Sequence, residues 1–519
     1  MTSPTAHETP RPAYQWPVVG AIAATVFAVH LIVNAITPYG VHRDEFLYAA
    51  MGRHLRLFGM DFPPLIALVA IVERALFGDS LIALRLVPAL AAAGIILLAA
   101  GIARELGGGR FAQGTAAVAL AMHPLFLRPG NLFQPVVLDQ LWWTATFYAL
   151  ARLRRTGDPR WWYAIGVVGG LGLLTKFSIL FLGVALLVAL LIEDRRALAT
   201  LGPWRALAIA LAIGAPSVIG QLRLGVPLAA QMSALRVSQL AHVSAGSFLR
   251  FQLLLGPSLL VAAAGLWSLY RKTKPELRAF RIIGATCAAA FATLLILRGK
   301  PYYVGPIYPT LFAAGGVWLE AFDLGTPRGA RVLRVATVTA IVLYGALVLP
   351  TGLPVLPPER MARYAQALGI AEATRTNRGT MLRLPQDYAD MIGWPERVAL
   401  VAHVYDSLPS EKRAQAVLLA ENYGEAGALD YFGPRFGLPA AVSAAGSYWF
   451  FGPGEKPGGV IITLGVDRRD LEHYCGVVTA AGRLTNDWSV EEEQDVSVYV
   501  CEQLKGTLQS LWPELAGRN

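Results

Sequence analysis

The sequence predicts a polytopic α-helical membrane protein with about 11 transmembrane helices, followed by a soluble C-terminal α/β domain. Three observations predict this fold class. Of the 519 residues, 55% are hydrophobic and only 15% are charged, and the mean hydropathy is +0.47. Apolar runs long enough to cross a bilayer recur from Trp16 to Pro350. After Pro357, charges become frequent and no further candidate span follows. The apolar runs there are short and β-like, at 416–420, 459–464 and 496–500.

The apolar runs divide the chain into three predicted parts. Residues 1–16 are polar and rich in proline, which predicts a disordered cytoplasmic N-terminus. Residues 17–350 form the predicted membrane domain, with a first outer loop at 38–80, and residues 351–519 form the soluble domain. The predicted spans are 17–37, 81–103, 110–124, 135–152, 161–175, 178–193, 203–223, 249–270, 281–297, 303–322 and 331–350.

The charges in the loops predict the orientation of these spans. Arginine and lysine gather in four loops that share one face if the span count is right, at 152–160, 195–205, 271–281 and 328–334. The positive-inside rule makes that face cytoplasmic. The N-terminus is then inside, and the first outer loop and the C-terminal domain are outside. Because these loops explain much of the net charge of +10, a nucleic-acid partner is not expected.

The first outer loop is predicted to hold two surface helices. Apolar residues recur there at helical spacing with basic residues between them, namely Phe46, Leu47, Ala50, Met51, Leu55 and Phe58. This pattern suits a helix that lies in the membrane interface. A second helix is predicted to start at Pro63 or Pro64, because proline is tolerated in a first helical turn.

Three acids near the starts of these two helices are the candidate catalytic residues. Asp44 and Glu45 come first, because a carboxylate at the outer edge of a membrane can take a proton from an acceptor hydroxyl. Asp61 precedes the second helix in the same way. The alternative is that these acids only cap the helices, which Asp does well. The cations in the same loop favour a catalytic role for these acids over simple helix capping.

Those cations include Arg43, Arg53 and His54, in an outer loop where the positive-inside rule predicts few. Arginine binds phosphate bidentately, so the cluster is a candidate substrate-binding site, with attraction to anionic lipid headgroups as the alternative. Lys176 lies in LLTKFS between two apolar runs, where an ammonium either snorkels to the interface or meets an anion. Asp139, inside an apolar span, is either a functional acid or the structural partner of a buried base.

A further group of candidate binding residues comes from the motif RGKPYYVGPIYP at the outer end of a span. Arg298 and Lys300 could hold a phosphate, and Tyr302 and Tyr303 lie beside them. An aromatic belt at the membrane interface also explains the tyrosines. Arg128, in HPLFLRPGN, is a weaker candidate. The histidines are scattered without the spacing of a metal site, and neither a metal nor a cofactor is expected.

Several of these motifs together resemble a known family. They are the D-E pair at Asp44 and Glu45, D-F-P-P-L from Asp61, HPLFLRPGN, LLTKFS and KPYY. In this order and on the outer face, they are similar to motifs of the GT-C glycosyltransferases of glycosyltransferase family 39. The nearest branch is the bacterial one that is similar to aminoarabinose transferases and protein O-mannosyltransferases. The resemblance covers roughly residues 17 to 350 and implies a GT-C type fold for the membrane domain.

The resemblance implies a bacterial inner-membrane glycosyltransferase. Such an enzyme moves a sugar, with inversion, from a polyprenyl-phosphate donor to an extracytoplasmic acceptor, which can be a lipid, a glycan or a protein. Asp44 then corresponds to the general base with Glu45 beside it, and Asp61 to a second acidic position. Asp139 corresponds to the acid of the fourth span, and Lys176 to a contact of the donor phosphate. The chain departs from the frequent family pattern T-P-D, because three residues separate the proline from Asp139.

Two other classes of function stay open at this point. A transporter or flippase for a lipid-linked sugar would be expected to show internal repeats and acids nearer the bilayer midplane. A non-catalytic membrane sensor would leave Asp44, Glu45 and Asp61 as simple helix caps. The sequence also leaves open whether Cys475 and Cys501 form a disulfide, which an outer location would permit.

Overall fold

The computed structural model describes residues 12–270, 275–369, 376 and 379–515, which fold into two compact units. The first, called the helical unit, comprises the described residues up to 36, with 63–65 and 85–353. The second, called the α/β unit, comprises 37–62, 66–84 and the described residues from 354 onwards. Most of the predicted disordered N-terminus lies outside the described residues, and the predicted domain boundaries stay predictions.

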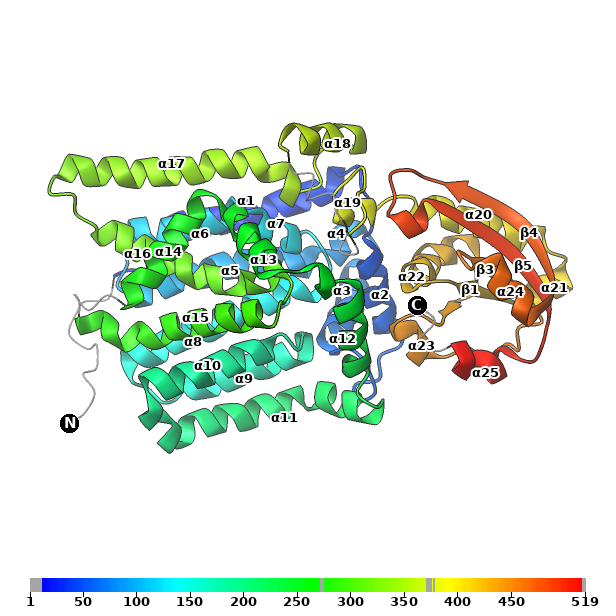
Figure 1. The fold of residues 1–519 in the computed structure, drawn as a ribbon, viewed down its shortest axis with the longest axis horizontal. Helices are drawn as coiled ribbons and strands as arrows, with labels where there is room; N and C mark the ends of the chain where they lie inside the picture. Colours follow the sequence, from blue (N-terminus) through cyan, green and yellow to red (C-terminus); the bar gives the residue numbers. More distant parts are fainter. Residues whose placement is uncertain (1–11, 271–274, 370–375, 377–378, 516–519) are drawn as a thin grey trace. The chain divides into compact units, whose positions relative to one another are not determined.

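The helical unit is built from α-helices and short 3-10 helices (Figure 1). Its α-helices are α1 (Trp16–Ile36), α5 (Leu86–Glu105), α6 (Arg110–Ala121), α7 (Pro124–Gly130), α8 (Pro135–Thr156), α9 (Trp161–Thr175), α10 (Ile179–Glu193), α11 (Leu201–Arg223), α12 (Pro227–Ser238), α13 (Ala245–Gln252), α14 (Pro257–Tyr270), α15 (Arg281–Ile296), α16 (Tyr308–Ala321) and α17 (Pro327–Gly352). Its 3-10 helices are η1 (Arg195–Ala199), η2 (Leu240–His242), η3 (Leu253–Leu255), η4 (Pro275–Phe280) and η5 (Pro301–Ile307).

Five helical segments of the described residues are long and apolar enough to cross a membrane by length and composition. They are Trp16–Ile36, Leu81–Glu105, Leu201–Arg223, Arg278–Ile296 and Pro327–Gly352. Each of them overlaps a predicted span, whereas the count of about 11 stays a prediction. The span predicted at 249–270 needs a correction, because two helical segments meet there at an angle of 104°. Gly256, with a φ of +55°, lies at the bend, followed by a proline that begins α14.

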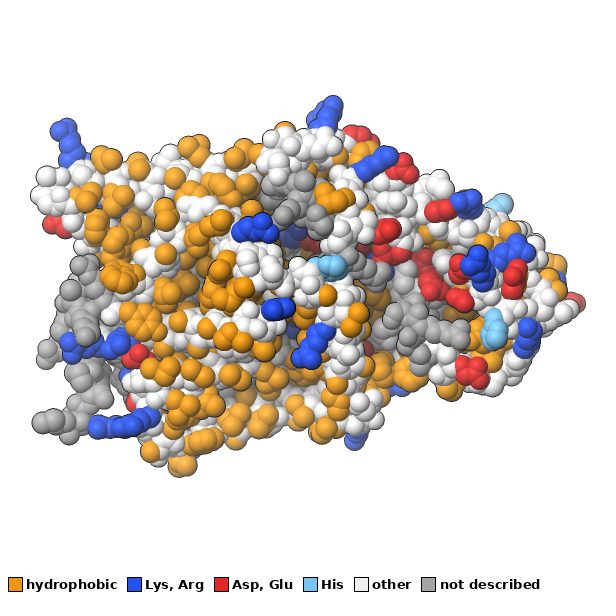
Figure 2. Space-filling model, viewed as in Figure 1, with side chains coloured by type: hydrophobic (Ala, Val, Ile, Leu, Met, Phe, Trp, Pro, Cys, Tyr) orange, Lys and Arg blue, Asp and Glu red, His pale blue; other side chains and the backbone are white. Residues whose placement is uncertain are grey.

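The helical unit exposes apolar side chains where a water-soluble protein would expose polar ones. On α10, Leu180, Val184, Leu187 and Leu191 are between 46% and 55% exposed, at helical spacing. Figure 2 shows hydrophobic side chains over most of the visible face of this unit. Because an apolar helix surface is stable against lipid chains but not against water, this unit is that of a multi-pass membrane protein.

The α/β unit contains one sheet, several helices and the two helices of the first outer loop (Figure 1). The loop helices are α2 (Arg43–Arg53) and α3 (Leu65–Phe77), followed by α4 (Leu81–Leu84). The strands are β1 (Ala416–Ala420), β2 (Ala441–Ser443), β3 (Val460–Leu464), β4 (Cys475–Thr485) and β5 (Asp495–Leu504). The other helices are α18 (Pro358–Ala367), α19 (Gln386–Ala389), α20 (Trp394–Ser407), α21 (Ser410–Gln415), α22 (Tyr423–Phe432), η7 (Gly433–Phe436), α23 (Ser447–Phe451), α24 (Arg468–Tyr474), η8 (Glu491–Glu493), α25 (Leu508–Leu511) and η9 (Trp512–Leu515).

The sheet has the strand order β2-β1-β3-β5-β4. Strands β2, β1 and β3 are parallel, and β5 runs antiparallel to both β3 and β4. Helix α22 contacts β1 and β2, and α20 contacts β3, β4, β5 and α22. The β-like runs predicted at 416–420, 459–464 and 496–500 coincide with β1, β3 and part of β5. The C-terminal region thus contains the sheet and helices of the predicted α/β domain.

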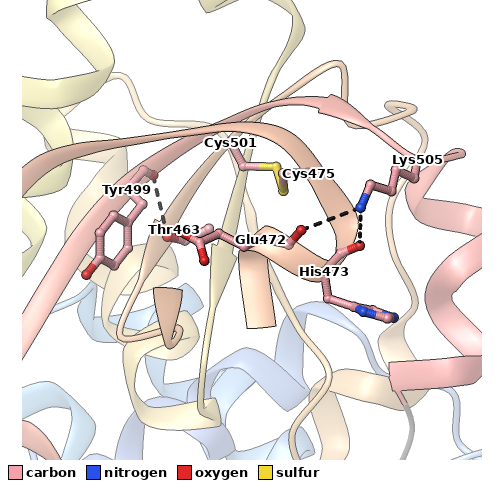
Figure 3. Close-up of a disulfide and its surroundings, with 7 residues drawn as sticks. All are labelled: Thr463, Glu472, His473, Cys475, Tyr499, Cys501 and Lys505. Atoms are coloured by element: carbon pink, nitrogen blue, oxygen red, sulfur yellow. Dashed lines mark hydrogen bonds between the residues drawn. A yellow bond between two sulfur atoms is a disulfide. The ribbon is translucent and has the colours of Figure 1, made fainter. Parts of the chain in front are cut away.

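A disulfide joins Cys475, at the start of β4, to Cys501 in β5 (Figure 3), which settles the pairing that the sequence left open. The bridge belongs to a buried apolar cluster that includes Ile461 and Trp512. Beside it, the Lys505 ammonium donates to the backbone oxygen of His473 at 2.8 Å, which satisfies a carbonyl at the end of α24. The cross-link constrains the antiparallel half of the sheet.

Candidate functional site

Helix α2 carries the first two candidate acids, and the structure gives them different surroundings. The N-cap of α2 is His42, whose Nδ1 accepts the Asp44 N–H at 3.0 Å. Oε2 of Glu45 accepts the His42 N–H at 2.7 Å, and the Glu45 side chain is buried. Glu45 thus closes a capping box with His42, whereas Asp44 lies in the first turn, is not the N-cap and is partly exposed. Glu45 therefore acts as a helix cap, whereas Asp44 does not.

Helix α2 packs closely on α22, and two glycines of α22 allow the approach. A Cβ on Gly427 would lie 2.5 Å from Cβ of Phe46, and a Cβ on Gly424 would lie 2.5 Å from Cγ of Arg43. Any larger residue at these positions would push the helices apart. The close approach brings Tyr423, the first residue of α22, to Asp44, and its hydroxyl donates to Oδ1 of Asp44 at 2.9 Å.

Opposite charges surround the start of α2. Nη1 of Arg43 lies 3.8 Å from Oδ1 of Asp390 and 3.1 Å from Oε1 of Glu492. The Arg43 guanidinium also lies 5.2 Å from the centre of the Tyr423 ring. Nε2 of His42 lies 3.7 Å from Oδ2 of Asp390. Because two carboxylates already compensate the charge of Arg43, this residue stabilises the helix start better than it could hold a phosphate.

Asp390 gives this cluster a pH dependence. Burial raises the pKa of Asp390 from 3.8 to about 7, although His42 and Arg43 lower it. The folded protein therefore binds this proton more tightly than the unfolded chain does. The stability of the folded state falls as the pH rises from about 4 to about 7. We expect Asp390→Asn, which cannot ionise, to gain unfolding temperature relative to wild type between about pH 4 and 7, with a constant difference above that range. Thermal unfolding of the purified full chain in detergent checks this.

The matched control for that series is Asp487→Asn, at an exposed carboxylate 3.0 Å from Arg383. Its unfolding temperature should follow that of the wild type at every pH. Parallel curves for Asp390→Asn and wild type across the whole range would show that Asp390 does not titrate as its burial requires.

The other candidates of the first outer loop face α22 and α23. Asp61 is buried, and Oδ2 accepts the Ser447 hydroxyl at 2.7 Å; burial raises the pKa of Asp61. Nη1 of Arg53 donates to the backbone oxygen of Asp430 at 2.6 Å. The ring of His54 stacks on Phe451 with centroids 4.2 Å apart, and burial lowers its pKa, which favours the neutral imidazole.

In the helical unit, two motifs that are far apart in the sequence meet. The Lys176 ammonium lies 4.8 Å from the centre of the Tyr303 ring, and that ring is 4.9 Å from the ring of Tyr302. The Lys300 ammonium lies 5.9 Å from the centre of the Tyr302 ring. Asp139 is buried in α8, and Lys176 acts on it electrostatically. The structure thus brings together an acid, two cations and two tyrosines of the predicted set.

The remaining predicted residues have other surroundings. Arg298 is exposed just after α15 and has a φ of +51°, an unusual backbone conformation for a residue with a side chain. Nη2 of Arg128 donates to the backbone oxygen of Thr351 at 2.8 Å. Among the described residues, no group of three or more His, Cys, Asp and Glu side chains is arranged to hold a metal ion.

Sequence reasoning did not find the residues that the C-terminal region supplies to the first outer loop. These are Asp390, Tyr423, Ser447 and Glu492, each of which contacts a residue of the first outer loop. In the sequence they lie more than 340 positions away from the residues that they contact, and none belongs to a motif with a recognised chemistry. The glycine-rich segment NYGEAG was the available signal, because glycine permits a close approach of two backbones.

Comparison with known proteins gives the fold and a partial family match. Residues 61–219 match the family model described as dolichyl-phosphate-mannose-protein mannosyltransferase. The fold is similar to the crystal structure of ArnT from Cupriavidus metallidurans bound to undecaprenyl phosphate. That likeness has a TM-score of 0.61 and 17% identity and covers 98% of this chain and 100% of that chain. No curated protein sequence matches significantly.

Two further structures share the fold. The archaeal oligosaccharyltransferase AglB from Archaeoglobus fulgidus, in complex with an inhibitory peptide and a dolichol-phosphate, matches with a TM-score of 0.51 and 12% identity over 85% of this chain and 69% of that chain. The arabinofuranosyltransferase AftD from Mycobacteria matches with a TM-score of 0.50 and 13% identity over 96% of this chain and 40% of that chain. The resemblance that the motifs predicted is therefore confirmed.

Proposed function

We propose that this chain, a relative of the GT-C glycosyltransferases, is a membrane enzyme that transfers a sugar from a polyprenyl-phosphate donor to an extracytoplasmic acceptor. The observation that carries the proposal is the match of residues 61–219 to the mannosyltransferase family model. The ArnT and AglB structures hold undecaprenyl phosphate and dolichol-phosphate, which supports a lipid-linked donor here. The proposed location is the bacterial inner membrane, with the reaction on its outer side.

Asp44 is the proposed general base. The acceptor hydroxyl oxygen attacks the anomeric carbon of the sugar, and the bond from that carbon to the phosphate oxygen breaks. The phosphate keeps the electron pair, and Asp44 takes the hydroxyl proton, so the anomeric centre inverts. Asp44 suits this role because its carboxylate is partly exposed and held by the Tyr423 hydroxyl. Glu45 is occupied by its capping box, and we give it no step.

Asp61 is proposed as the second acidic residue of the first outer loop. Burial raises the pKa of Asp61, and its Oδ2 accepts the Ser447 hydroxyl, which holds this carboxyl group beside α23. Arg53 and His54 lie in the same loop and are proposed to contact the acceptor or the donor headgroup. Arg43 is proposed to hold the start of α2, because its charge is paired with Asp390 and Glu492.

The cations of the helical unit are proposed to bind the donor phosphate. The leaving phosphate gains negative charge as the glycosidic bond breaks, and a fixed cation stabilises that charge. Lys176 is the proposed main contact, with Lys300 and Arg298 as further cations. Tyr303 stacks with Lys176 and limits the positions that its ammonium can take.

Replacing Lys176 by methionine tests the phosphate role. The change keeps an unbranched side chain of similar length and removes the ammonium, so we expect binding of undecaprenyl phosphate to weaken about 10- to 100-fold. Titration of the purified full chain in lipid nanodiscs with undecaprenyl phosphate measures this. The control Lys412→Met removes a surface ammonium that pairs with Glu502 and should leave binding unchanged. Equal affinity of Lys176→Met and wild type would mean that Lys176 only snorkels.

A further inference from the structure

We infer that the C-terminal region is part of the catalytic machinery, with Tyr423 as a positioning residue that holds the Asp44 carboxylate in place. Resting on the proposed function, the inference gives the soluble domain a role in the reaction. It concerns contacts inside the α/β unit alone, because α2 and the C-terminal sheet belong to that same unit.

The first observation is the direct hydrogen bond. The Tyr423 hydroxyl donates to Oδ1 of Asp44 at 2.9 Å, across 379 positions of sequence. Burial raises the pKa of Tyr423 well above its usual value, and the Asp44 charge adds to the shift. The phenol therefore keeps its proton and can only be the donor in this bond. A hydrogen bond to an ionised carboxylate is stronger than one between neutral groups, so it restricts the Asp44 side chain.

The second observation is the set of backbone contacts at the start of α2. The Arg43 N–H donates to the backbone oxygen of Asp390 at 3.1 Å, and the Gly40 N–H donates to that of Met391 at 3.2 Å. These bonds fix the chain just before and at the first residue of the helix. The Arg43 guanidinium adds its contacts with Asp390 and Glu492. Backbone and side chain of the helix start are thus both held by the C-terminal region.

The third observation explains how a tyrosine reaches this position. Gly424 and Gly427 follow Tyr423 on α22, and the overlap that any Cβ would cause there shows how closely α22 approaches α2. The glycines cost some helix stability, because glycine is a poor helix former. Their presence is accounted for by the close approach that places the Tyr423 hydroxyl on Asp44. A general base must be held to within a fraction of an ångström to be effective.

The test compares Tyr423→Phe with Tyr448→Phe. Tyr423→Phe keeps the ring beside Arg43 and removes only the hydroxyl. Tyr448 is the matched control, because its buried hydroxyl also donates to a carboxylate, Oδ2 of Asp430, at 2.7 Å. For Tyr423→Phe we expect kcat to fall on the order of 10²-fold at most, with the KM for the donor unchanged. Tyr448→Phe should keep the kcat of the wild type. Equal kcat values for all three proteins would overturn the inference.

A second measurement does not need turnover. Hydrogen–deuterium exchange of the α2 amides is compared in wild type, Tyr423→Phe, Asp44→Ala, which removes the acceptor oxygen, and the double variant. If the hydroxyl holds Asp44, Tyr423→Phe accelerates exchange in α2 severalfold, and this effect shrinks in the Asp44→Ala background. Purely additive effects would overturn the inference. If the wild type turns over no donor while the exchange effects are non-additive, the proposed function fails and the contact between Tyr423 and Asp44 stands.

Discussion

Replacing Asp44 by asparagine is expected to lower kcat for sugar transfer by about 10²–10⁴-fold, the usual contribution of a general base. Asparagine has the same shape as aspartate, and its amide oxygen can still accept the Tyr423 hydroxyl. It cannot take a proton from the acceptor, so the loss should fall on kcat while the KM for the donor stays near the wild-type value. Steady-state kinetics of both proteins in the same lipid checks this.

Asp79→Asn is the matched control for that experiment. Asp79 is a half-exposed carboxylate that follows α3 in the same loop and pairs with Arg74 at 3.2 Å. Its replacement should leave kcat unchanged. A kcat for Asp44→Asn within a factor of about three of wild type, a change of less than one kcal/mol in the barrier, would exclude Asp44 as the base. It would favour the interpretation that the acids of this loop only stabilise the local fold, as helix caps do.

Replacing Arg397 by methionine is expected to destabilise the α/β unit by about 3–5 kcal/mol, because a buried charge loses its partner. Arg397 and Glu493 are each 1% exposed, and Nε of Arg397 lies 3.2 Å from Oε2 of Glu493. The guanidinium also donates to Oγ of Ser489 at 3.0 Å and to the backbone oxygen of Ile392 at 3.1 Å. Glu425 lies nearby, and burial, reinforced by Glu493, raises its pKa well above the usual range.

Hydrogen–deuterium exchange of peptides from β1, β3 and β5 in the full chain measures this loss of stability, since exchange in a core strand reports the opening of the unit. Arg483→Met is the control, because Arg483 pairs with Asp495 at the exposed surface of the sheet. Exchange in that variant should match the wild type. If Arg397→Met also exchanged like the wild type, the pair of Arg397 and Glu493 would not be the structural centre that its burial indicates.

The sequence predicted those elements whose signal is local. The buried strands β1 and β3 are short apolar runs, and they lie within one residue of their predicted positions. By contrast, β2 has only three residues, and β4 alternates weakly because one edge of the sheet exposes most of its side chains. Neither has an apolar pattern strong enough to be seen without its neighbours. The bend at Gly256 was missed because the residues on both sides are apolar enough for one continuous span.

Prediction of the candidate site was likewise limited to what local sequence patterns show. Sequence reasoning selected Asp44 and Glu45 together, and only the structure separates them, since His42 is the N-cap and Glu45 completes its capping box. Histidine is not among the preferred N-cap residues, so no local rule predicted this arrangement. The contact of Lys176 with Tyr303 joins two motifs that were selected separately. Tyr423 was beyond reach, because nothing in one sequence links position 423 to position 44.

The most direct test of the proposed transferase activity is sugar release from a panel of radiolabelled polyprenyl-phosphate sugars. The purified full chain is assayed in lipid, with Asp44→Asn assayed in parallel. The proposal predicts that the wild type transfers or slowly hydrolyses the sugar of at least one donor, and that Asp44→Asn, while still folded, does not. Binding of the lipid-linked sugars without release from any donor would contradict the proposal and favour transport or sensing.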